Sequence, residues 1–140
     1  MNLSYAIRRN KRRLIGMLPG QRAQFRREAM VGPLGFWDEL RAYQLRALRE
    51  NGLQPSHRLL DLGCGPLQGG IAFIRYLEPG GYYGLDRYAA ALDDGYRQIG
   101  EQGLAPKNPR LVHTDRFDPP ALKGVQFDYV WASQILYYFN

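Results

Sequence analysis

The fold is decided by Leu59-Leu60-Asp61-Leu62-Gly63-Cys64-Gly65-Pro66-Leu67-Gln68-Gly69-Gly70. This stretch begins as a short apolar run, which is typical of a buried strand, and ends as a glycine cluster. Residues 71–77 follow as an apolar segment that favours a helix. A strand, a glycine turn and a helix form the start of a βαβ unit that holds a nucleotide-like ligand. We expect Gly63 and Gly65 where the backbone turns sharply and the ligand comes close.

The spacing of the glycines separates two classes of ligand. A dinucleotide fingerprint has the pattern G-x-G-x-x-G, and its third glycine would fall at Gln68. Asp61 lies two residues before the first glycine, at the end of the predicted strand. The pattern Asp61-x-Gly63-Cys64-Gly65 resembles motif I of class I S-adenosylmethionine (SAM)-dependent methyltransferases. In that family the glycine turn packs against the methionine part and the ribose of the cofactor.

The rest of the chain predicts an alternation of strands and helices. The expected strands cover 58–62, 82–86, 110–113 and 126–132, and the expected helices cover 36–51, 69–77 and 89–102, with a further helix starting over 135–139. We expect Leu40, Tyr43, Ala47 and Leu48 to form the apolar face of the first of these helices. The alternation predicts an α/β fold, a Rossmann-like, doubly wound and mostly parallel sheet that is incomplete, with about four strands.

Composition indicates a soluble globular chain. Its 140 residues are enough for one domain with a core, and no apolar run approaches the length of a membrane span. Cys64 is the single cysteine, so the chain has no internal disulfide and no expected metal site. This usage fits a reducing compartment and a cytoplasmic protein. We expect Cys64 to be a small packing residue beside the ligand, and a reactive thiol is the less favoured alternative.

The net charge of +6 is concentrated near the N-terminus. Residues 1–30 carry Arg8, Arg9, Lys11, Arg12, Arg13, Arg22, Arg26 and Arg27, opposed only by Glu28. This basic extension is expected to form one or two helical segments, broken near Pro19-Gly20. Three roles stay open: a solvated arm, an arm that contacts nucleic acid, or an amphipathic arm on an anionic membrane surface. Sparse aromatic residues weaken the version in which bases stack on the arm.

Several residues are expected to bind the cofactor at the carboxyl ends of the strands. Asp86 ends the second strand, 21 residues after Gly65, where a carboxylate accepts from both ribose hydroxyls; an N-cap is the alternative. The resemblance implies that Asp115 accepts from the adenine amino group, although Thr114-Asp115 equally fits a turn cap. The full predicted set is Asp61, Gly63, Cys64, Gly65, Gln68, Asp86, Arg87, Asp115, Arg116 and Ser133.

The resemblance covers residues 31–140 and implies a SAM-binding Rossmann-like methyltransferase domain. SAM is the implied cofactor, and the implied activity is methyl transfer to an unidentified acceptor. A small-molecule acceptor is favoured, and nucleic acid stays open because of the basic arm. The alternatives are a non-enzymatic SAM-binding fragment and, less favoured, an NAD(P)-dependent oxidoreductase. No catalytic residue is assigned.

The chain supplies four of the seven strands of the family's sheet. The fourth strand has apolar residues on both faces, with Tyr129 and Trp131 alternating with Val130. Without a further neighbour it would expose apolar surface and an open edge. We therefore expect a truncated or partial sequence, a partner that completes the sheet, or a dimer through that edge.

Overall fold

The computed structural model describes residues 3–31, 33–133 and 135 and divides the chain into two compact units, Met1–Leu40 and Arg41–Asn140. The division falls inside helix α3 (Trp37–Glu50). The helix expected over 135–139 lies outside the described residues, apart from Ile135. None of the described helices is both long enough and apolar enough to cross a membrane.

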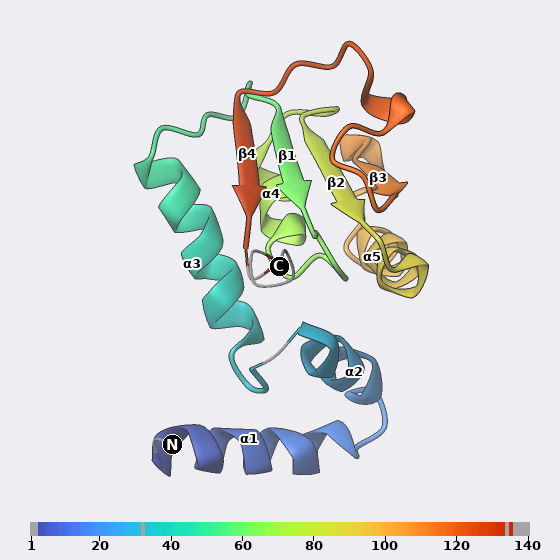
Figure 1. Cartoon of the computed structure of the whole chain (residues 1–140). Helices are drawn as coiled ribbons and strands as arrows, with labels where there is room; N and C mark the ends of the chain where they lie inside the picture. Colours follow the sequence, from blue (N-terminus) through green and yellow to red (C-terminus); the bar gives the residue numbers. More distant parts are fainter. Residues whose placement is uncertain (1–2, 32, 134, 136–140) are drawn as a thin grey trace. The chain divides into compact units, whose positions relative to one another are not determined.

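The first unit contains two helices, α1 (Leu3–Gly16) and α2 (Arg22–Val31), called here the N-terminal helix pair (Figure 1). The predicted break at Pro19-Gly20 is confirmed, because residues 17–21 form a turn between the helices. A Cβ on Gly16 would overlap the ring of Phe25, so the glycine lets the end of α1 approach α2 closely.

A buried carboxylate holds the helix pair together. Glu28 accepts from Nε of Arg12 at 2.8 and 2.9 Å with its two oxygens, from Nε2 of Gln24, and from the backbone N–H of Gly35. Burying a charge is costly unless it is paired and hydrogen-bonded, and Glu28 meets both conditions. The single acid of this basic segment is therefore part of its packing.

The second unit is built on a four-stranded parallel sheet with the order β3-β2-β1-β4 (Figure 1). The strands are β1 (Leu59–Leu62), β2 (Tyr82–Asp86), β3 (Arg110–His113) and β4 (Tyr129–Ala132). From β1 the chain moves outward to β2 and β3, and then returns to pair β4 with the other side of β1. The strand order therefore reverses between β1 and β4, and the carboxyl ends of these two paired strands form the topological switch point, where open α/β sheets bind ligands. The predicted sheet is confirmed.

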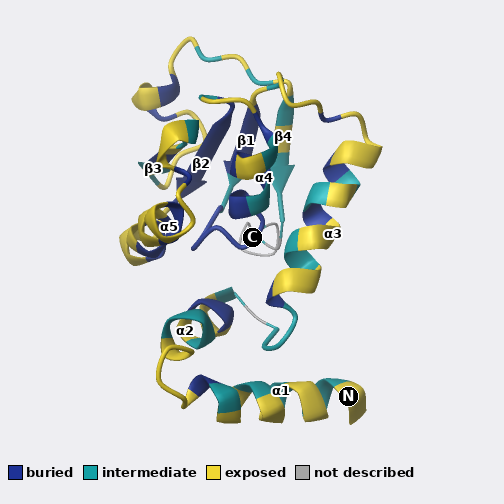
Figure 2. Cartoon of the chain, turned by 180° about the vertical axis from the view of Figure 1, so that it is seen from behind, coloured by how far each residue is buried: buried dark blue, intermediate teal, exposed yellow. Residues whose placement is uncertain are grey.

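Helices cover one face of this sheet. The crossover helices α4 (Gly70–Tyr76) and α5 (Ala89–Glu101) lie on the face seen in Figure 2. The part of α3 from Arg41 onward contributes Leu45 and Leu48 to the same core. That core also takes in Leu59, Phe73 and Tyr82, which are almost fully buried.

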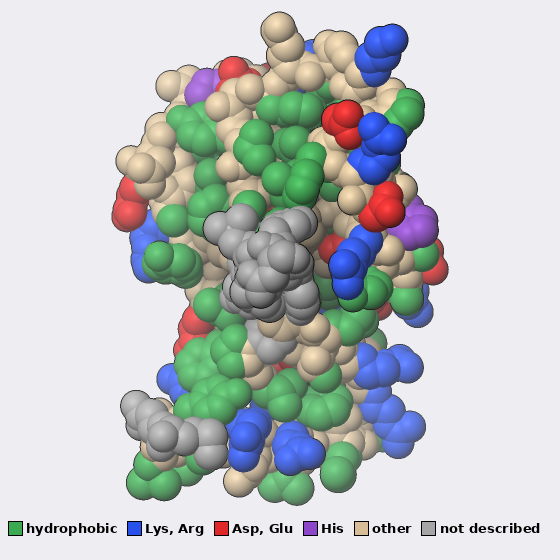
Figure 3. Space-filling view, viewed as in Figure 1, with side chains coloured by type: hydrophobic (Ala, Val, Ile, Leu, Met, Phe, Trp, Pro, Cys, Tyr) green, Lys and Arg blue, Asp and Glu red, His purple; other side chains and the backbone are tan. Residues whose placement is uncertain are grey.

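The other face carries a smaller apolar cluster. Leu60, Tyr83 and Leu85 pack there with Leu122 from the 3-10 helix η2 (Pro120–Leu122), and a second short 3-10 turn, η1 (Ala105–Lys107), precedes β3. Figure 3 shows hydrophobic side chains gathered on this side of the second unit. Val130 of β4 is more than half exposed, so the expected exposure of apolar surface by the fourth strand is confirmed.

Two local predictions were wrong. Strand β4 begins at Tyr129 and not at residue 126, because Asp128 bonds Arg58 with its side chain and its backbone N–H instead of extending the ladder. The predicted apolar face of α3 included Tyr43, which is 55% exposed, whereas Gln44 is buried. Partners distant in the sequence satisfy the Gln44 amide.

Candidate functional site

The glycine turn between β1 and α4 folds back onto the end of β2. Gly63 and Gly65 have φ values of +67° and +51°, in the left-handed region that favours glycine. The N–H groups of Gly63 and Cys64 both donate to the carbonyl oxygen of Leu85, at 2.8 and 3.0 Å. A Cβ on Gly63 would also overlap Cγ2 of Ile135. The turn therefore needs glycine at the two predicted positions.

Asp86 joins the first strand's turn to the second strand. Its Oδ2 accepts from the N–H of Gly65 at 2.8 Å, and its Oδ1 accepts from the N–H of Tyr88 at 2.8 Å. The N-cap alternative for Asp86 was wrong, because the N-cap of α5 is Tyr88 and no side chain bonds as its cap. A carboxylate oxygen can accept two hydrogen bonds, so each oxygen retains one lone pair for a ligand.

Asp61 lies inside the sheet and below the turn. Its Oδ2 accepts from the hydroxyl of Tyr82 at 2.7 Å, and both side chains are buried. Burial raises the pKa of Asp61 from 3.8 to about 7; the Tyr82 hydrogen bond lowers the pKa and the Asp86 charge raises it. Burial is also the main cause that raises the pKa of Tyr82 well above its ordinary value. Sequence reasoning missed Tyr82, although its place opposite Leu59 follows from the parallel register.

Cys64 points into the core. Its Sγ lies so close to Gly84 of β2 that a Cβ there would be 2.7 Å from the sulfur. Burial is the largest cause that raises the pKa of the Cys64 thiol well above its ordinary value, with the charges of Asp61 and Asp86 adding to the effect. The structure thus gives Cys64 the predicted packing role, and only its backbone faces the turn.

Gln68 belongs to a chain of polar side chains behind the turn. Nε1 of Trp131 donates to Oε1 of Gln44 at 3.0 Å, and Nε2 of Gln44 donates to Oε1 of Gln68 at 3.2 Å. Among the described residues, Nε2 of Gln68 is a buried donor without a hydrogen-bond partner. The backbone carbonyl of Gln68 accepts from Nε of Arg41 at 2.8 Å. These bonds tie α3, the turn and β4 together, and no pattern in the sequence predicts them.

The rest of the turn is packed tightly against β2. Leu67 is fully buried with a φ of +61°, an uncommon conformation for a residue other than glycine. A Cβ on Gly70 would lie 2.5 Å from the hydroxyl of Tyr82. In a dinucleotide fingerprint the third glycine permits close helix–strand packing. Here Gly70, two residues after Gln68, makes that approach.

The remaining predicted residues follow the ends of the other strands. Arg87 follows β2, with its guanidinium 4.8 Å from the ring centroid of Tyr88. Asp115 and Arg116 follow β3 and are exposed; Arg116 pairs with Asp118 at 3.1 Å. The cap expected at Thr114-Asp115 is made by Thr114, because its Oγ1 accepts from the N–H of Arg116. Ser133 follows β4 and is half-buried.

Most of the predicted residues therefore follow the carboxyl ends of the parallel strands, whereas Asp61 lies within β1 and the side chain of Gln68 bonds α3 behind the turn. The backbone bond from Thr114 to the carbonyl of Asp86 links the ends of β2 and β3 directly. This edge combines a close-approach glycine turn, an acceptor at the end of β2 and exposed polar groups after β3. Such an arrangement suits a nucleoside with hydroxyls and a polar base.

Comparisons with known proteins agree on the fold. No protein-family model and no curated protein matches the chain. Among solved structures, magnesium protoporphyrin IX methyltransferase from Synechocystis PCC 6803, with bound SAM, is 17% identical, with 100% of this chain and 67% of that chain covered and a TM-score of 0.62. A putative SAM-dependent methyltransferase from Methanococcus maripaludis is 15% identical, with coverages of 71% and 44% and a TM-score of 0.59.

A third structure has a higher sequence identity. Precorrin-6y C5,15-methyltransferase from Geobacter metallireducens GS-15 is 26% identical, with coverages of 67% and 47% and a TM-score of 0.52. The chain thus spans about half the length of the last two of these structures. It has the fold of the SAM-dependent methyltransferases, and the resemblance seen in Asp61 to Gly65 is confirmed at the level of the fold.

Proposed function

We propose that this chain binds SAM at the glycine turn and serves methyl transfer to a small-molecule acceptor in the cytoplasm. The observation that carries the proposal is the bond from the N–H of Gly65 to Oδ2 of Asp86. It brings the turn after β1 and the acceptor after β2 together, as a nucleoside requires. In this proposal residues 31–140 form the SAM-binding domain and residues 1–30 a basic extension.

The residues present fit the cofactor. The lone pairs left on Asp86 accept from the ribose hydroxyls, and the glycine turn leaves room for the methionine part. Asp115 offers an acceptor to the adenine amino group, beside Arg116. The cofactor supplies an activated methyl group for in-line displacement, so the protein's contribution is position and electrostatics. Ser133, at the switch point beside β1, lies on the side where an acceptor would approach.

An oxidoreductase that uses NAD(P) is the weaker candidate. Gln68 stands where the third glycine of the fingerprint would be, and its side chain is committed to Gln44. Asp61, two residues before the first glycine, matches the methyltransferase pattern and also argues against the dinucleotide fingerprint. The fold alone admits both classes, so the distinction needs a direct measurement.

Calorimetric titration with S-adenosylhomocysteine and, in parallel, with NAD tests the proposal. We expect S-adenosylhomocysteine to bind with a Kd of about micromolar order and NAD not to bind. Asp86→Asn should weaken binding by about tenfold or more, since hydrogen bonds to charged groups contribute about 1.5–3 kcal/mol. Asp93→Asn, the same change on an exposed part of α5, is the matched control.

Asp86 also accepts hydrogen bonds from two backbone N–H groups, so its substitution can lower the stability of the fold. The thermal unfolding of each variant must therefore be measured beside its ligand binding. The wild-type comparison of the two ligands does not depend on this control. Binding of NAD in preference to S-adenosylhomocysteine would overturn the proposal. A folded chain that binds neither ligand would also contradict it, and binding without turnover of any acceptor would favour the non-enzymatic alternative.

A further inference from the structure

We propose that the N-terminal helix pair docks on the surface of an anionic lipid bilayer. The inference goes beyond the proposed function, because none of the predicted cofactor residues lies in residues 3–31. It rests on three features of this segment: a row of exposed aliphatic side chains, a strong positive charge, and a hollow that combines both.

The aliphatic row runs along one side of α1. Leu3, Ile7 and Leu14 fall within about 40° of one another on a helix that turns 100° per residue. Each is more than half exposed, as are Met17, Leu18 and Met30. The opposite side of α1 is turned toward its own unit, with Arg12 bound to Glu28 and Gly16 against Phe25. The exposed row is therefore additional to the residues that pack the helix pair.

The charge of the segment complements an anionic surface. Residues 3–31 hold eight basic side chains and one acid, a net charge of +7, whereas residues 32–140 hold eleven basic and twelve acidic side chains, a net charge of −1. The one acid, Glu28, is buried in its contacts with Arg12 and Gln24. By helical position, Lys11 borders the aliphatic row on one side and Arg13 on the other, and both are exposed. Figure 3 shows basic and hydrophobic side chains next to one another on this segment.

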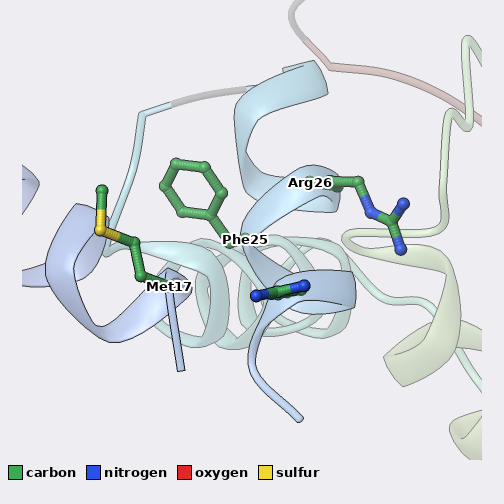
Figure 4. A pocket seen from close by; sticks show the side chains of 5 residues that line it. Met17, Phe25 and Arg26 are labelled. Atoms are coloured by element: carbon green, nitrogen blue, oxygen red, sulfur yellow. The ribbon is translucent and has the colours of Figure 1, made fainter. Parts of the chain in front are cut away.

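A hollow at the turn between the helices has the same mixed character. It is lined by Gly16, Met17, Arg22, Phe25 and Arg26. Figure 4 shows Met17 and Phe25 on one side of the start of α2, with Arg26 extending away from them. Apolar groups beside guanidinium groups suit the boundary between acyl chains and acidic headgroups.

The same features argue for lipid over nucleic acid. Tyr5 stacks on Phe36 at 6.1 Å between centroids, and Phe25, which lines the hollow, also packs against Gly16, so the rings that would stack on bases already have packing partners. The exposed apolar side chains of the segment are aliphatic. Aliphatic side chains contribute little to binding RNA or DNA, but they partition into a lipid interface.

The test is sedimentation of the full chain with vesicles of equimolar phosphatidylglycerol and phosphatidylcholine, against pure phosphatidylcholine vesicles. We expect binding to the anionic vesicles only, weakened by added salt. Ile7→Gln/Leu14→Gln should weaken binding by about tenfold or more, because both aliphatic groups leave water on docking. Lys11→Gln/Arg13→Gln should weaken it by about thirtyfold, at about 1 kcal/mol for each cation.

Matched controls lie in the second unit. Val130→Gln removes an aliphatic side chain of comparable exposure, and Arg58→Gln/Lys123→Gln removes two exposed cations. Both should bind like wild type. All the substituted helix-pair residues are exposed, and circular dichroism verifies that each variant keeps its helices. Ile7→Trp preserves an apolar group and should bind while its tryptophan emission shifts to the blue on anionic vesicles.

Four outcomes would overturn the proposal. The first is the absence of binding to anionic vesicles, and the second is binding that survives Ile7→Gln/Leu14→Gln, which would indicate charge attraction alone. The third is competition in which single-stranded RNA removes the chain from vesicles at equal concentration of charge, which would assign the surface to nucleic acid. An Ile7→Trp variant that binds without a blue shift would likewise contradict docking by this row.

Discussion

The buried carboxyl group of Asp61 in β1 predicts how the free energy of unfolding depends on pH. Asp61 is 5% exposed, and its hydrogen bond from Tyr82 does not offset burial, so its pKa rises from 3.8 to about 7. Between these two values the carboxyl is protonated in the folded chain and ionised in the unfolded chain. The folded state then binds more protons, so the free energy of unfolding falls as pH rises.

The size of the effect follows from the shift. Each pH unit between about 4 and 7 should lower the contribution of Asp61 by about 1.4 kcal/mol, which gives about 4 kcal/mol over the whole range. Below pH 3.8 both states are protonated and above about pH 7 both are ionised, so the contribution is flat there. This direction is opposite to that of a salt-bridged carboxylate, whose contribution is lost as pH falls.

Asp61→Asn isolates this contribution, because an amide oxygen still accepts from Tyr82 and does not titrate. Urea unfolding of wild type and variant at several pH values from about 4 to 8 should show the variant gaining relative stability up to about pH 7 and then running parallel. Asp115→Asn, at an exposed position, gives the reference for the same change of side chain. Curves for wild type and Asp61→Asn that stay parallel from pH 4 to 7 would refute the reasoning.

Two further predictions concern the packing of the turn. Gly70→Ala should destabilise the chain by about 1–3 kcal/mol in urea unfolding, because its Cβ would lie 2.5 Å from the Tyr82 hydroxyl. The control is Gly100→Ala in α5, which has open space around it and should stabilise the chain by up to about 1 kcal/mol. Equal effects of the two substitutions on stability would contradict the packing described. The Cys64 thiol is buried and its pKa is raised, so in the native chain it should react with iodoacetamide at less than about a hundredth of its rate in urea. Mass spectrometry measures the labelling. Rapid labelling of the native chain would contradict the prediction, because it would show that the thiol is accessible.

Local patterns were enough to predict most of the scaffold. Strands β2 and β3 begin and end at the predicted residues, and the helix pair is broken at Pro19-Gly20 as expected. In these segments apolar runs and glycine or proline breaks agree with the fold at every level. The two glycines of the turn were predictable for the same reason, since positive φ values at Gly63 and Gly65 need that residue.

What the sequence did not predict depends on contacts between distant residues. The buried face of α3 contains Gln44 because Gln68 and Trp131, 24 and 87 positions away, satisfy its amide. A pattern of hydrophobicity cannot report such partners, so the exposed Tyr43 was placed on the apolar face instead. Asp61 was recognised as part of a motif, but its burial depends on Tyr82 across the strand pair.

Three departures from ordinary folding rules lie close to the glycine turn. A buried acid with a raised pKa (Asp61), a buried leucine in a left-handed conformation (Leu67) and a buried amide donor without a partner among the described residues (Gln68) all lie within eight residues of one another. Each costs stability, and none is needed to form a strand, a turn and a helix. Strain of this kind is expected where a sequence is constrained by a ligand more than by its fold. The three costs near Gly63 and Gly65 are consistent with the proposed SAM site.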